Sequence, residues 1–493
     1  MKKLLVANRG EIAIRVFRTA KEMGIKTVAV FSEADRSSAH VAFADEAVCI
    51  GPPPPNESYL LIERVIAAAK ETGADAIHPG YGFLSERAEF VEACAFAGIK
   101  FVGPSASAMR KLGGKIDAKK LAVASGVPIT PGFFEPGANC EELARAAMEI
   151  GYPVMLKASA GGGGRGMRIV RDPADFDQEF EIASDEALKG FGDGAMMVEK
   201  LVDRPRHIEV QFLADSHGNV VCLFERECSL QRRHQKLVEE APSTVVSQEV
   251  WDNLRTAVAS LARNAGYQGA GTAEFIYDAI SHQPYFLEVN ARLQVEHPVT
   301  EAITGVDLVR QQLLIAQGLP MECKERPREQ IRGHAIEVRI VAEDPAAGFM
   351  PSIGKLVGWA EPQGPGIRVD TGFGAGAEVS RFYDSMIAKL IVHAETRPLA
   401  IEKLRKAMLD FHVLGVKTNI AYILNVIDHA DFARAEFDTD WLAREFGGWV
   451  PPSAVPDEVL GISSFAASSG SNQASGSIPG AWDETDSFRL TRA

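Results

Sequence analysis

The sequence predicts an α/β and α+β multidomain protein, in which an open parallel α/β sheet domain precedes a region of antiparallel sheet. Three observations support this. The chain has 493 residues, too many for one ordinary core. Short apolar runs alternate with amphipathic helical segments over the first hundred residues. From residue 206 the pattern changes to long alternating strands joined by hairpin turns.

The first domain is expected over residues 1–128. Its first strand, "KLLVA" (3–7), leads through a turn into a helix from Glu11 to Met23, which Gly24 ends. The later strands are expected at 26–31, 46–50, 75–79 and 99–103, with helices at 58–72 and 86–97. Continuous apolar strands separated by helices are typical of a parallel sheet covered on both faces.

A second unit is expected over residues 129–201, after a Pro/Gly-rich hinge at 126–133. Its predicted elements are a helix at 141–150, strands at 153–158 and 166–170, a helix at 173–189 and a strand at 195–200. The third unit, 202–447, holds the antiparallel sheet. Its predicted elements are hairpins at 207–225 and 272–290, a helix at 301–317, strands at 334–342, 354–359 and 386–393, and helices at 398–412 and 418–428. The remaining 448–493 are rich in Ser, Gly and Pro and predict a disordered tail.

Composition excludes several classes of partner. The net charge of −14 argues against nucleic acid or an anionic membrane as a bulk partner. No apolar run is long enough to span a bilayer. The six cysteines show no metal-binding spacing, so a reducing cytoplasm is the simplest expectation.

The stretch "KASAGGGGRGMRIV" (157–170) places four consecutive glycines between two strand-like segments. A dinucleotide fingerprint requires a helix directly after its glycines, and here "MRIV" predicts a strand. A glycine-rich hairpin tip is instead suited to lay backbone N–H groups over phosphates, although a merely flexible turn is the alternative.

Two carboxylates and an amide recur on the last predicted hairpin. Alternation puts Glu288 and Asn290 on one strand face, and pairing could bring Glu274 opposite them. Such oxygen donors suit magnesium, whereas the alternative is a solvated face with unrelated glutamates. In "RLQVEHPVTE" (292–301), Arg292, Gln294 and Glu296 are predicted to share a strand face; an arginine fork there matches a small planar oxyanion, and the glutamate could act as a base.

With these residues assembled, the chain resembles the biotin carboxylases, the ATP-grasp component of biotin-dependent carboxylases. The resemblance runs from Leu4 to about Gly447 and includes "ANRGEIAIRV", "HPGYGFLSE", "ECSLQRRHQKLVEEAP", "EVNARLQVEHPVTE", "RGHAIEVR" and "YDSMIAKL". It implies that 1–128 is a biotin carboxylase N-terminal domain, that 129–201 is an ATP-grasp lid, and that 202–447 is the C-terminal ATP-grasp region.

The resemblance also assigns roles to residues. It implies ATP contacts from Lys115, Lys157, Gly162, Gly163, Gly164, Gly166, Glu199, Lys200, His207, Gln231 and His234. Metal binding is implied for Glu274, Glu288 and Asn290. Bicarbonate would be bound by Lys236, Arg292, Gln294 and Val295, with Glu296 as its base, and Arg339 would stabilise the biotin anion beside Tyr81.

The implied reaction is carboxylation of biotin through carboxyphosphate, with ATP, bicarbonate and Mg²⁺ (or Mn²⁺). No Met-Lys-Met stretch, the usual site of biotin attachment, occurs in the chain, so we expect biotin on a separate carboxyl carrier protein. A carboxyltransferase subunit and a homodimer are also expected. Residues 481–490, "AWDETDSFRL", resemble the segment that follows this domain in larger acyl-CoA carboxylase α chains.

Two alternatives stay open. Another ATP-grasp ligase, such as an amino-acid ligase or a carbamoyl phosphate synthetase half, shares the lid and the metal carboxylates. A catalytically dead assembly subunit rests on two departures from the family pattern. Gly114 stands where Asp is usual, and Val341 stands where Asn is common.

Overall fold

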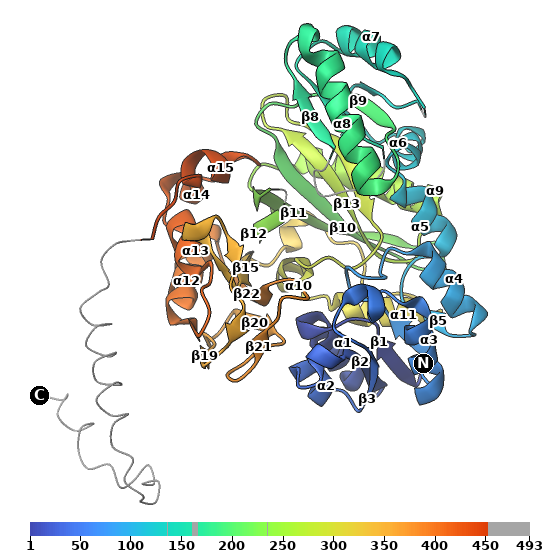
Figure 1. Cartoon of the computed structure of the whole chain (residues 1–493), viewed down its shortest axis with the longest axis vertical. Helices are drawn as coiled ribbons and strands as arrows, with labels where there is room; N and C mark the ends of the chain where they lie inside the picture. The colour runs from blue at the N-terminus through green and yellow to red at the C-terminus, as the bar shows by residue number, and fades with distance from the viewer. Residues whose placement is uncertain (136, 160–165, 234, 452–493) are drawn as a thin grey trace, which may run out of the picture. The chain divides into compact units, whose positions relative to one another are not determined.

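The structure, a computed structural model, describes residues 1–135, 137–159, 166–233 and 235–451. The chain begins with a five-stranded sheet in the order β3-β2-β1-β4-β5, in which every neighbouring pair is parallel (Figure 1). Its strands are β1 (Lys3–Val6), β2 (Lys26–Ser32), β3 (Glu46–Gly51), β4 (Ala76–His78) and β5 (Lys100–Phe101). The helices between them are α1 (Gly10–Glu22), α2 (Ala39–Phe43), α3 (Ile62–Thr72) and α4 (Ala88–Phe96). The predicted open parallel α/β sheet is therefore confirmed.

The strand order fixes where this sheet can bind a ligand. From β1 the chain moves to β2 on one side, and later to β4 on the other. The carboxyl ends of β1 and β4 are therefore neighbours at a topological switch point, where open α/β sheets bind ligands. The loops that follow these two strands carry "NRGE" and "HPGYG".

A four-stranded antiparallel sheet follows, in the order β6-β9-β7-β8. It consists of β6 (Gly132–Phe133), β7 (Val154–Ala158), β8 (Met167–Val170) and β9 (Met196–Lys200), with helices α7 (Cys140–Ile150) and α8 (Phe176–Phe191). Asn139 and Glu142 form a capping box that starts α7. Leu143, Leu156, Phe176 and Val198 belong to an apolar core made only of residues from this segment. The glycine run thus joins two antiparallel strands, as predicted, although its tip lies outside the described residues.

An eight-stranded antiparallel sheet forms the rest of the framework, in the order β14-β13-β10-β11-β12-β15-β22-β20. Its strands are β10 (Arg206–Ala214), β11 (Val220–Arg232), β12 (Gln235–Ala241), β13 (Gly269–Asp278), β14 (Gln283–Asn290), β15 (His334–Val341), β20 (Ile367–Thr371) and β22 (Met386–Ala394). Helix α9 (Gln248–Ala265) packs Trp251 and Leu254 into the core of one half of this sheet, and α12 (Arg397–Asp410) covers the other half with Leu404. The antiparallel part of the prediction is confirmed.

Several shorter elements complete the described chain. The helices are α5 (Ala106–Gly113), α6 (Lys115–Ala124), α10 (His297–Thr304), α11 (Leu308–Ala316), α13 (Ile420–Ile427), α14 (Ala430–Arg434) and α15 (Trp441–Phe446). The strands are β16 (Glu343–Asp344), β17 (Met350–Pro351), β18 (Gly354–Lys355), β19 (Gly358–Ala360), β21 (Glu378–Val379) and β23 (His412–Leu414). Among the helices of the described chain, none has both the length and the apolar character needed to cross a bilayer.

Three local predictions are wrong. The helix expected at 301–317 is two helices, because Gly305 ends α10 in the left-handed conformation at φ 70°. The strand expected at 354–359 is split into β18 and β19. Residues 292–296 form a loop and a turn before α10 and are not a strand, so they have no common strand face.

Candidate active site

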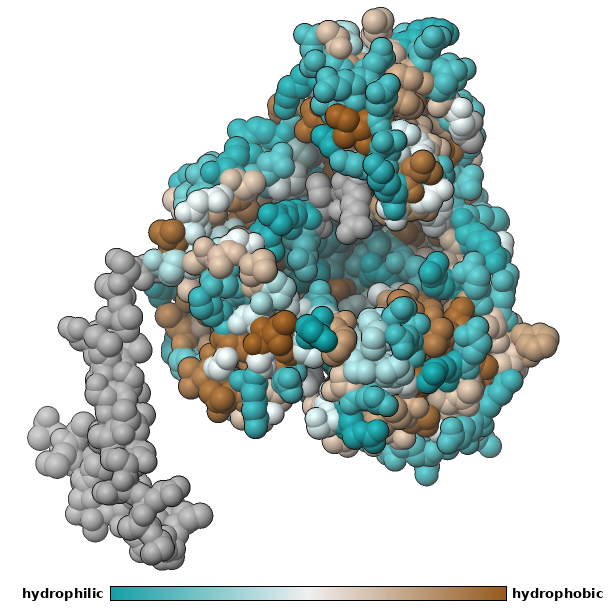
Figure 2. Space-filling model, in the orientation of Figure 1, coloured by the Kyte–Doolittle hydropathy of each residue, from teal (hydrophilic) through white to brown (hydrophobic). Residues whose placement is uncertain are grey.

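A cavity of about 1170 Å³ is lined by residues of the four-stranded and eight-stranded sheets and by the loops at the switch point of the five-stranded sheet. Figure 2 shows a hollow in the surface with hydrophilic side chains on its floor. The sequence-predicted residues that line the cavity are Tyr81, Lys157, Glu199, Lys200, His207, Gln231, Lys236, Glu274, Glu288, Asn290, Arg292, Gln294, Val295 and Arg339. Residues that are more than 200 positions apart in the sequence therefore meet in one place.

The loop after β4 is held by the loop after β1. The Asn8 amide donates to the carbonyls of Pro79 and Tyr81 at 2.8 and 2.7 Å. Gly80 has φ +65°, and a Cβ there would lie 2.8 Å from the Asn8 amide nitrogen, so glycine is required. The Tyr81 hydroxyl donates to Glu11, and burial together with this carboxylate raises the pKa of Tyr81 well above its usual value. Tyr81 is therefore a neutral hydroxyl group at the edge of the cavity.

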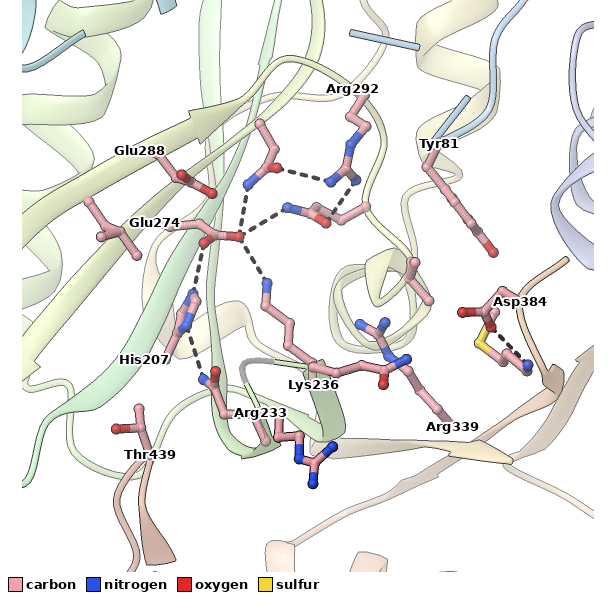
Figure 3. A pocket seen from close by; sticks show the side chains of 18 of the residues that line it. Tyr81, His207, Arg233, Lys236, Glu274, Glu288, Arg292, Arg339, Asp384 and Thr439 are labelled. Carbon is pink, nitrogen blue, oxygen red and sulfur yellow. Dashed lines mark hydrogen bonds and ion pairs between the residues drawn. The ribbon is translucent and has the colours of Figure 1, made fainter. Parts of the chain in front are cut away.

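The predicted carboxylate pair is confirmed as a geometric pair. Glu274 in β13 lies directly opposite Glu288 in β14, and the Asn290 amide donates to Glu274 at 2.8 Å (Figure 3). Burial alone would raise the pKa of Glu274, but Lys236 and His207 lower it, so the carboxylate is ionised at neutral pH. Two carboxylates and an amide oxygen at a cavity wall match the oxygen donors that Mg²⁺ takes in proteins.

The Lys236 ammonium group lies among three carboxylates. Its Nζ lies 2.5 Å from Glu209, 2.9 Å from Glu274 and 2.6 Å from Glu296. Burial would lower the pKa of Lys236, but these three carboxylates raise it well above its usual value. The ammonium group is therefore charged, and it points toward these three carboxylates.

Glu296 lies beneath the cavity lining and is only 1% exposed. One carboxylate oxygen accepts from Lys236, and the other accepts from Arg339 at 3.0 Å. Against the effect of burial, Lys236, Arg339 and Arg226 hold the pKa of Glu296 well below its usual value. Glu296 is therefore an ionised carboxylate enclosed by cations, which keep its basicity low.

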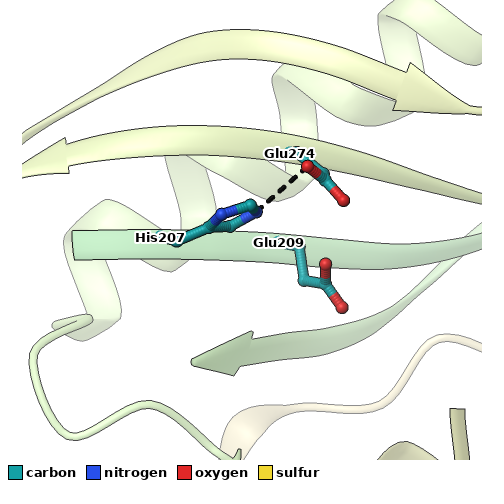
Figure 4. A group of neighbouring side chains, drawn as sticks. All are labelled: His207, Glu209 and Glu274. Carbon is teal, nitrogen blue, oxygen red and sulfur yellow. Dashed lines mark ion pairs between the residues drawn. The ribbon is translucent and has the colours of Figure 1, made fainter. Parts of the chain in front are cut away.

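His207, Glu209 and Glu274 also form a compact group of possible metal ligands (Figure 4). His207 Nε2 lies 3.0 Å from a Glu274 oxygen. Burial lowers the pKa of His207, but Glu274 raises it further, so the net shift is upward. The other ring nitrogen, Nδ1, lies 3.3 Å from the Gln231 amide nitrogen, so the imidazole is held between Glu274 and Gln231.

Arg292 is held by acceptors on three sides. Its guanidinium donates to Glu86 at 2.8 Å, and to Gln294 and Asn290 at 3.0 Å each. Arg292, Gln294 and Glu296 therefore come together because the loop folds around the arginine. The expectation that they share a strand face is wrong.

Arg339 in β15 bridges two buried carboxylates. It donates to Glu239 at 2.7 Å as well as to Glu296. Burial raises the pKa of Glu239 to about 7, although Arg339 opposes that rise. The guanidinium is therefore fixed at the cavity wall by one acceptor from β12 and one from the turn that precedes α10.

The four-stranded sheet and α6 supply a second cationic group. Glu199 accepts from Lys157 at 2.7 Å and from Thr130 at 3.0 Å, and it is ion-paired with Lys119. Burial would raise the pKa of Glu199, but Lys157 and Lys119 lower it to about 2. Lys200 instead donates to the Gly151 carbonyl at 2.8 Å.

Some predicted residues are not placed. Gly162, Gly163, Gly164 and His234 lie outside the described residues, as does the Lys115 side chain. Gly166 is described and buried at φ +68°, where a Cβ would lie 3.0 Å from the Ala158 methyl group. Its backbone conformation alone therefore requires glycine, whatever it binds.

Sequence reasoning missed several neighbours of the site, namely Glu11, Glu86, Lys119, Glu209 and Glu239. Glu209 could have been predicted from the sequence, because it follows His207 by two positions and so lies on the same strand face. The partners of Glu86 and Glu239 come from distant segments and left no local signal.

The two departures from the family pattern leave the charged groups in place. Gly114 precedes α6 at φ −83°, and a Cβ there would lie 3.2 Å from an Asp117 oxygen. The Val341 N–H donates to Asn419, whose amide also donates to the Arg339 carbonyl at 2.9 Å. Asn419 thus supports the end of β15 from outside the cavity.

Comparison with known proteins identifies the family of this chain. Family models match as "Biotin carboxylase, N-terminal domain" over 1–109, "Carbamoyl-phosphate synthase L chain, ATP binding domain" over 114–324, and "Biotin carboxylase C-terminal domain" over 337–444. Biotin carboxylase 1 of Bacillus subtilis is 46% identical over 442 residues, which cover 90% of this chain and 98% of that protein.

Two further relatives extend the comparison. The mitochondrial methylcrotonoyl-CoA carboxylase subunit alpha of Rattus norvegicus is 50% identical over 91% of this chain, and the chain spans 63% of that longer protein. The biotin carboxylase domain of the Hydrogenobacter thermophilus 2-oxoglutarate carboxylase superposes with a TM-score of 0.85 at 46% identity, over 90% of this chain and 97% of that one. The chain therefore belongs to the biotin carboxylases, which are ATP-grasp ligases.

Proposed function

We propose that this chain uses ATP and bicarbonate to carboxylate biotin on a separate carrier protein, as the first half-reaction of an acyl-CoA or pyruvate carboxylase. The observation that carries the proposal is Glu296, an ionised carboxylate enclosed by Lys236 and Arg339 at the base of the cavity. It has the position and charge of a base for a small acid bound above it.

Bicarbonate is proposed to bind to Arg292, Gln294, Lys236 and the Val295 N–H. Glu296 takes the proton of bicarbonate, and the oxygen that is freed attacks the γ-phosphorus of ATP, which forms carboxyphosphate and releases ADP. Lys236 neutralises charge that develops on this oxygen, as a preorganised cation does in a buried site. Bicarbonate itself is a poor electrophile, whereas carboxyphosphate carries a good leaving group.

Carboxyphosphate then breaks into carbon dioxide and phosphate. The phosphate accepts the N1′ proton of biotin, and the N1′ lone pair attacks carbon dioxide to form N-carboxybiotin. Arg339 would stabilise the negative charge on the ureido oxygen before this attack, and Tyr81 would lie beside the ring. Because water would hydrolyse the intermediate, a closed cavity is needed.

The nucleotide is proposed to lie between the lid and the large sheet. Lys157 and Lys200 would contact the phosphates together with Lys115, His207, Gln231 and the glycine run. Magnesium held by Glu274, Glu288 and Asn290 would supply charge neutralisation at the phosphates. The H. thermophilus domain was solved as a dimer in complex with MgADP, ADP and bicarbonate, which supports the same ligands and a homodimer here.

The test is ATP hydrolysis by the purified chain with Mg²⁺. Hydrolysis that requires bicarbonate and rises with free biotin is the expected result. Stimulation by ammonia or an amino acid in place of bicarbonate would favour another ATP-grasp ligase. Nucleotide binding without any turnover would identify a catalytically dead assembly subunit.

A further inference from the structure

A buried lysine that was not among the predicted residues lies next to the proposed bicarbonate site. Lys389 in β22 lies opposite Arg339 in β15 and opposite Asp370 in β20, and its side chain is 0% exposed. Its Nζ donates to the Val295 carbonyl at 2.8 Å and lies 3.5 Å from Glu11 and 3.8 Å from Asp370. Lys389 therefore contacts three segments that are far apart in the sequence.

Lys389 is charged in this environment. Burial would lower its pKa, and Arg368 acts in the same direction, but Glu11, Glu337 and Asp370 raise it above its usual value. Burying an ammonium group is unfavourable until its partners offset the loss of hydration, and an apolar residue would fill the same space without that penalty. The charge therefore points to a requirement other than stability.

The contact with Val295 fixes a peptide plane. The Val295 carbonyl and the Glu296 N–H belong to one peptide unit, so Lys389 orients the backbone that precedes Glu296. In the preceding unit, His297 Nδ1 donates to the Gln294 carbonyl at 2.8 Å. Because a trans peptide directs its N–H opposite to its carbonyl, this second contact aims the Val295 N–H away from His297.

The same ammonium group is linked to Tyr81. Glu11 Oε1, which lies 3.5 Å from Lys389, is also the atom that accepts the Tyr81 hydroxyl. Glu11 lies in the first turn of α1, where the backbone at Gly10 comes close to the backbone at Gly372. A Cβ on Gly372, just after β20, would lie 2.8 Å from the backbone of Gly10. The position of Glu11 relative to β20 and β22 is therefore tightly defined.

We propose that Lys389 is a positioning residue that holds the peptide between Val295 and Glu296 beside the bicarbonate site and, through Glu11, holds Tyr81 for biotin. This inference rests on the proposed function, since it assumes that these two substrates occupy the cavity. In this proposal, the buried Lys389 cation sets the distance between the bicarbonate site and the biotin site.

The experiment is steady-state kinetics of the full chain with the Lys389→Met substitution, in a bicarbonate-dependent ATPase assay with free biotin. We expect the KM for bicarbonate to rise about tenfold or more while the KM for ATP stays within about twofold, because the nucleotide contacts are elsewhere. Lys389→Arg keeps the charge and should recover part of the loss. Lys403→Met is the matched control, since Lys403 also donates to two backbone carbonyls, at Pro365 and His393, outside the cavity lining.

A double substitution separates positioning from folding. Lys389→Met leaves Glu11 without its cation, and the variant could unfold for that reason alone. Lys389→Met combined with Glu11→Gln removes both charges, and melting temperatures show whether it folds. We expect the double variant to keep the raised KM for bicarbonate, and Glu11→Gln alone to raise the KM for biotin without changing that for bicarbonate.

The outcomes are distinct. If the folded double variant has the KM for bicarbonate of the unaltered chain, or if all KM values move together and Lys389→Arg recovers nothing, then Lys389 is structural and the inference is wrong. If the unaltered chain shows no bicarbonate-dependent hydrolysis, the proposed function itself fails.

Discussion

Lys236 Nζ lies 2.6 Å from one oxygen of Glu296, while Arg339 donates to the other oxygen of the same carboxylate. This pairing keeps Glu296 ionised, and it also keeps its basicity low. Any substrate oxygen that engages Lys236 weakens the pairing and makes Glu296 a stronger base. In the proposed function, this geometry would link proton removal by Glu296 to the arrival of an anion beside Lys236.

Substitution of Glu296 tests this directly. Glu296→Gln keeps the shape of the side chain but removes the proton acceptor, so bicarbonate-dependent ATP hydrolysis should fall about 10²- to 10⁴-fold. Binding of a fluorescent ATP analogue should be unchanged. Glu225→Gln is the control, since Glu225 is a buried carboxylate paired with Arg328 outside the cavity lining. Equal loss in both variants would contradict a role for Glu296 as the base.

Arg339 should affect biotin more than bicarbonate. Arg339→Met removes the guanidinium proposed to stabilise the biotin anion, so the stimulation of ATP hydrolysis by free biotin should disappear. Hydrolysis without biotin should fall less, because the contacts of Lys236 with Glu296 remain. The ratio of the two rates is the measurement. A variant in which both rates fall by the same factor would contradict this assignment.

The carboxylate pair predicts a specific metal dependence. Glu288→Gln reduces the charge of the proposed ligand set by one while keeping an oxygen donor, so half-maximal activity should need about tenfold more Mg²⁺ or above. Titration of activity with MgCl₂ at saturating ATP measures this, and EDTA should abolish activity in the unaltered chain. An unchanged magnesium titration would remove Glu288 from the proposed site.

Glu199 predicts how stability depends on pH. Folding lowers its pKa from 4.5 to about 2, chiefly through Lys157 and Lys119 acting against burial. Its contribution is therefore fully present above pH 4.5 and is lost as the pH falls toward 2. Glu199→Gln should lower the free energy of unfolding at pH 7 by up to about 3 kcal/mol. Urea denaturation at pH 7 and at pH 3 should show this difference shrinking with acid, and a difference independent of pH would contradict it.

The parts of the site that follow from local pattern could be predicted from the sequence. Alternation put Glu288 and Asn290 on one strand face and left Glu274 as a possible partner across the hairpin, and the observed register places Glu274 opposite Glu288. The charged cluster around Lys236 was not accessible in this way. Its partners Glu209 and Glu296 come from a strand two positions away in the sheet and from a loop, so only the assembled sheet brings them together.

Helix breaks and loops were the weaker part of the prediction. The periodicity of residues 301–317 continues through Gly305, and the break follows from a glycine in the left-handed conformation at the end of α10. The polar residues of 292–296 alternate as a strand would. They form a loop because Arg292 donates to Glu86, Asn290 and Gln294, and not to a neighbouring strand. Tertiary hydrogen bonds of this kind override local pattern.

The small sheet of residues 132–200 encloses its own apolar interior, formed by residues such as Leu143 and Phe176. A segment with its own apolar core can move as a rigid body about its two connections to the rest of the chain without exposing that core to water. The same independence makes this segment a natural unit for exchange between related enzymes. Chimeras joined near residues 131 and 201 should keep both partners folded while altering how fast nucleotide enters and leaves.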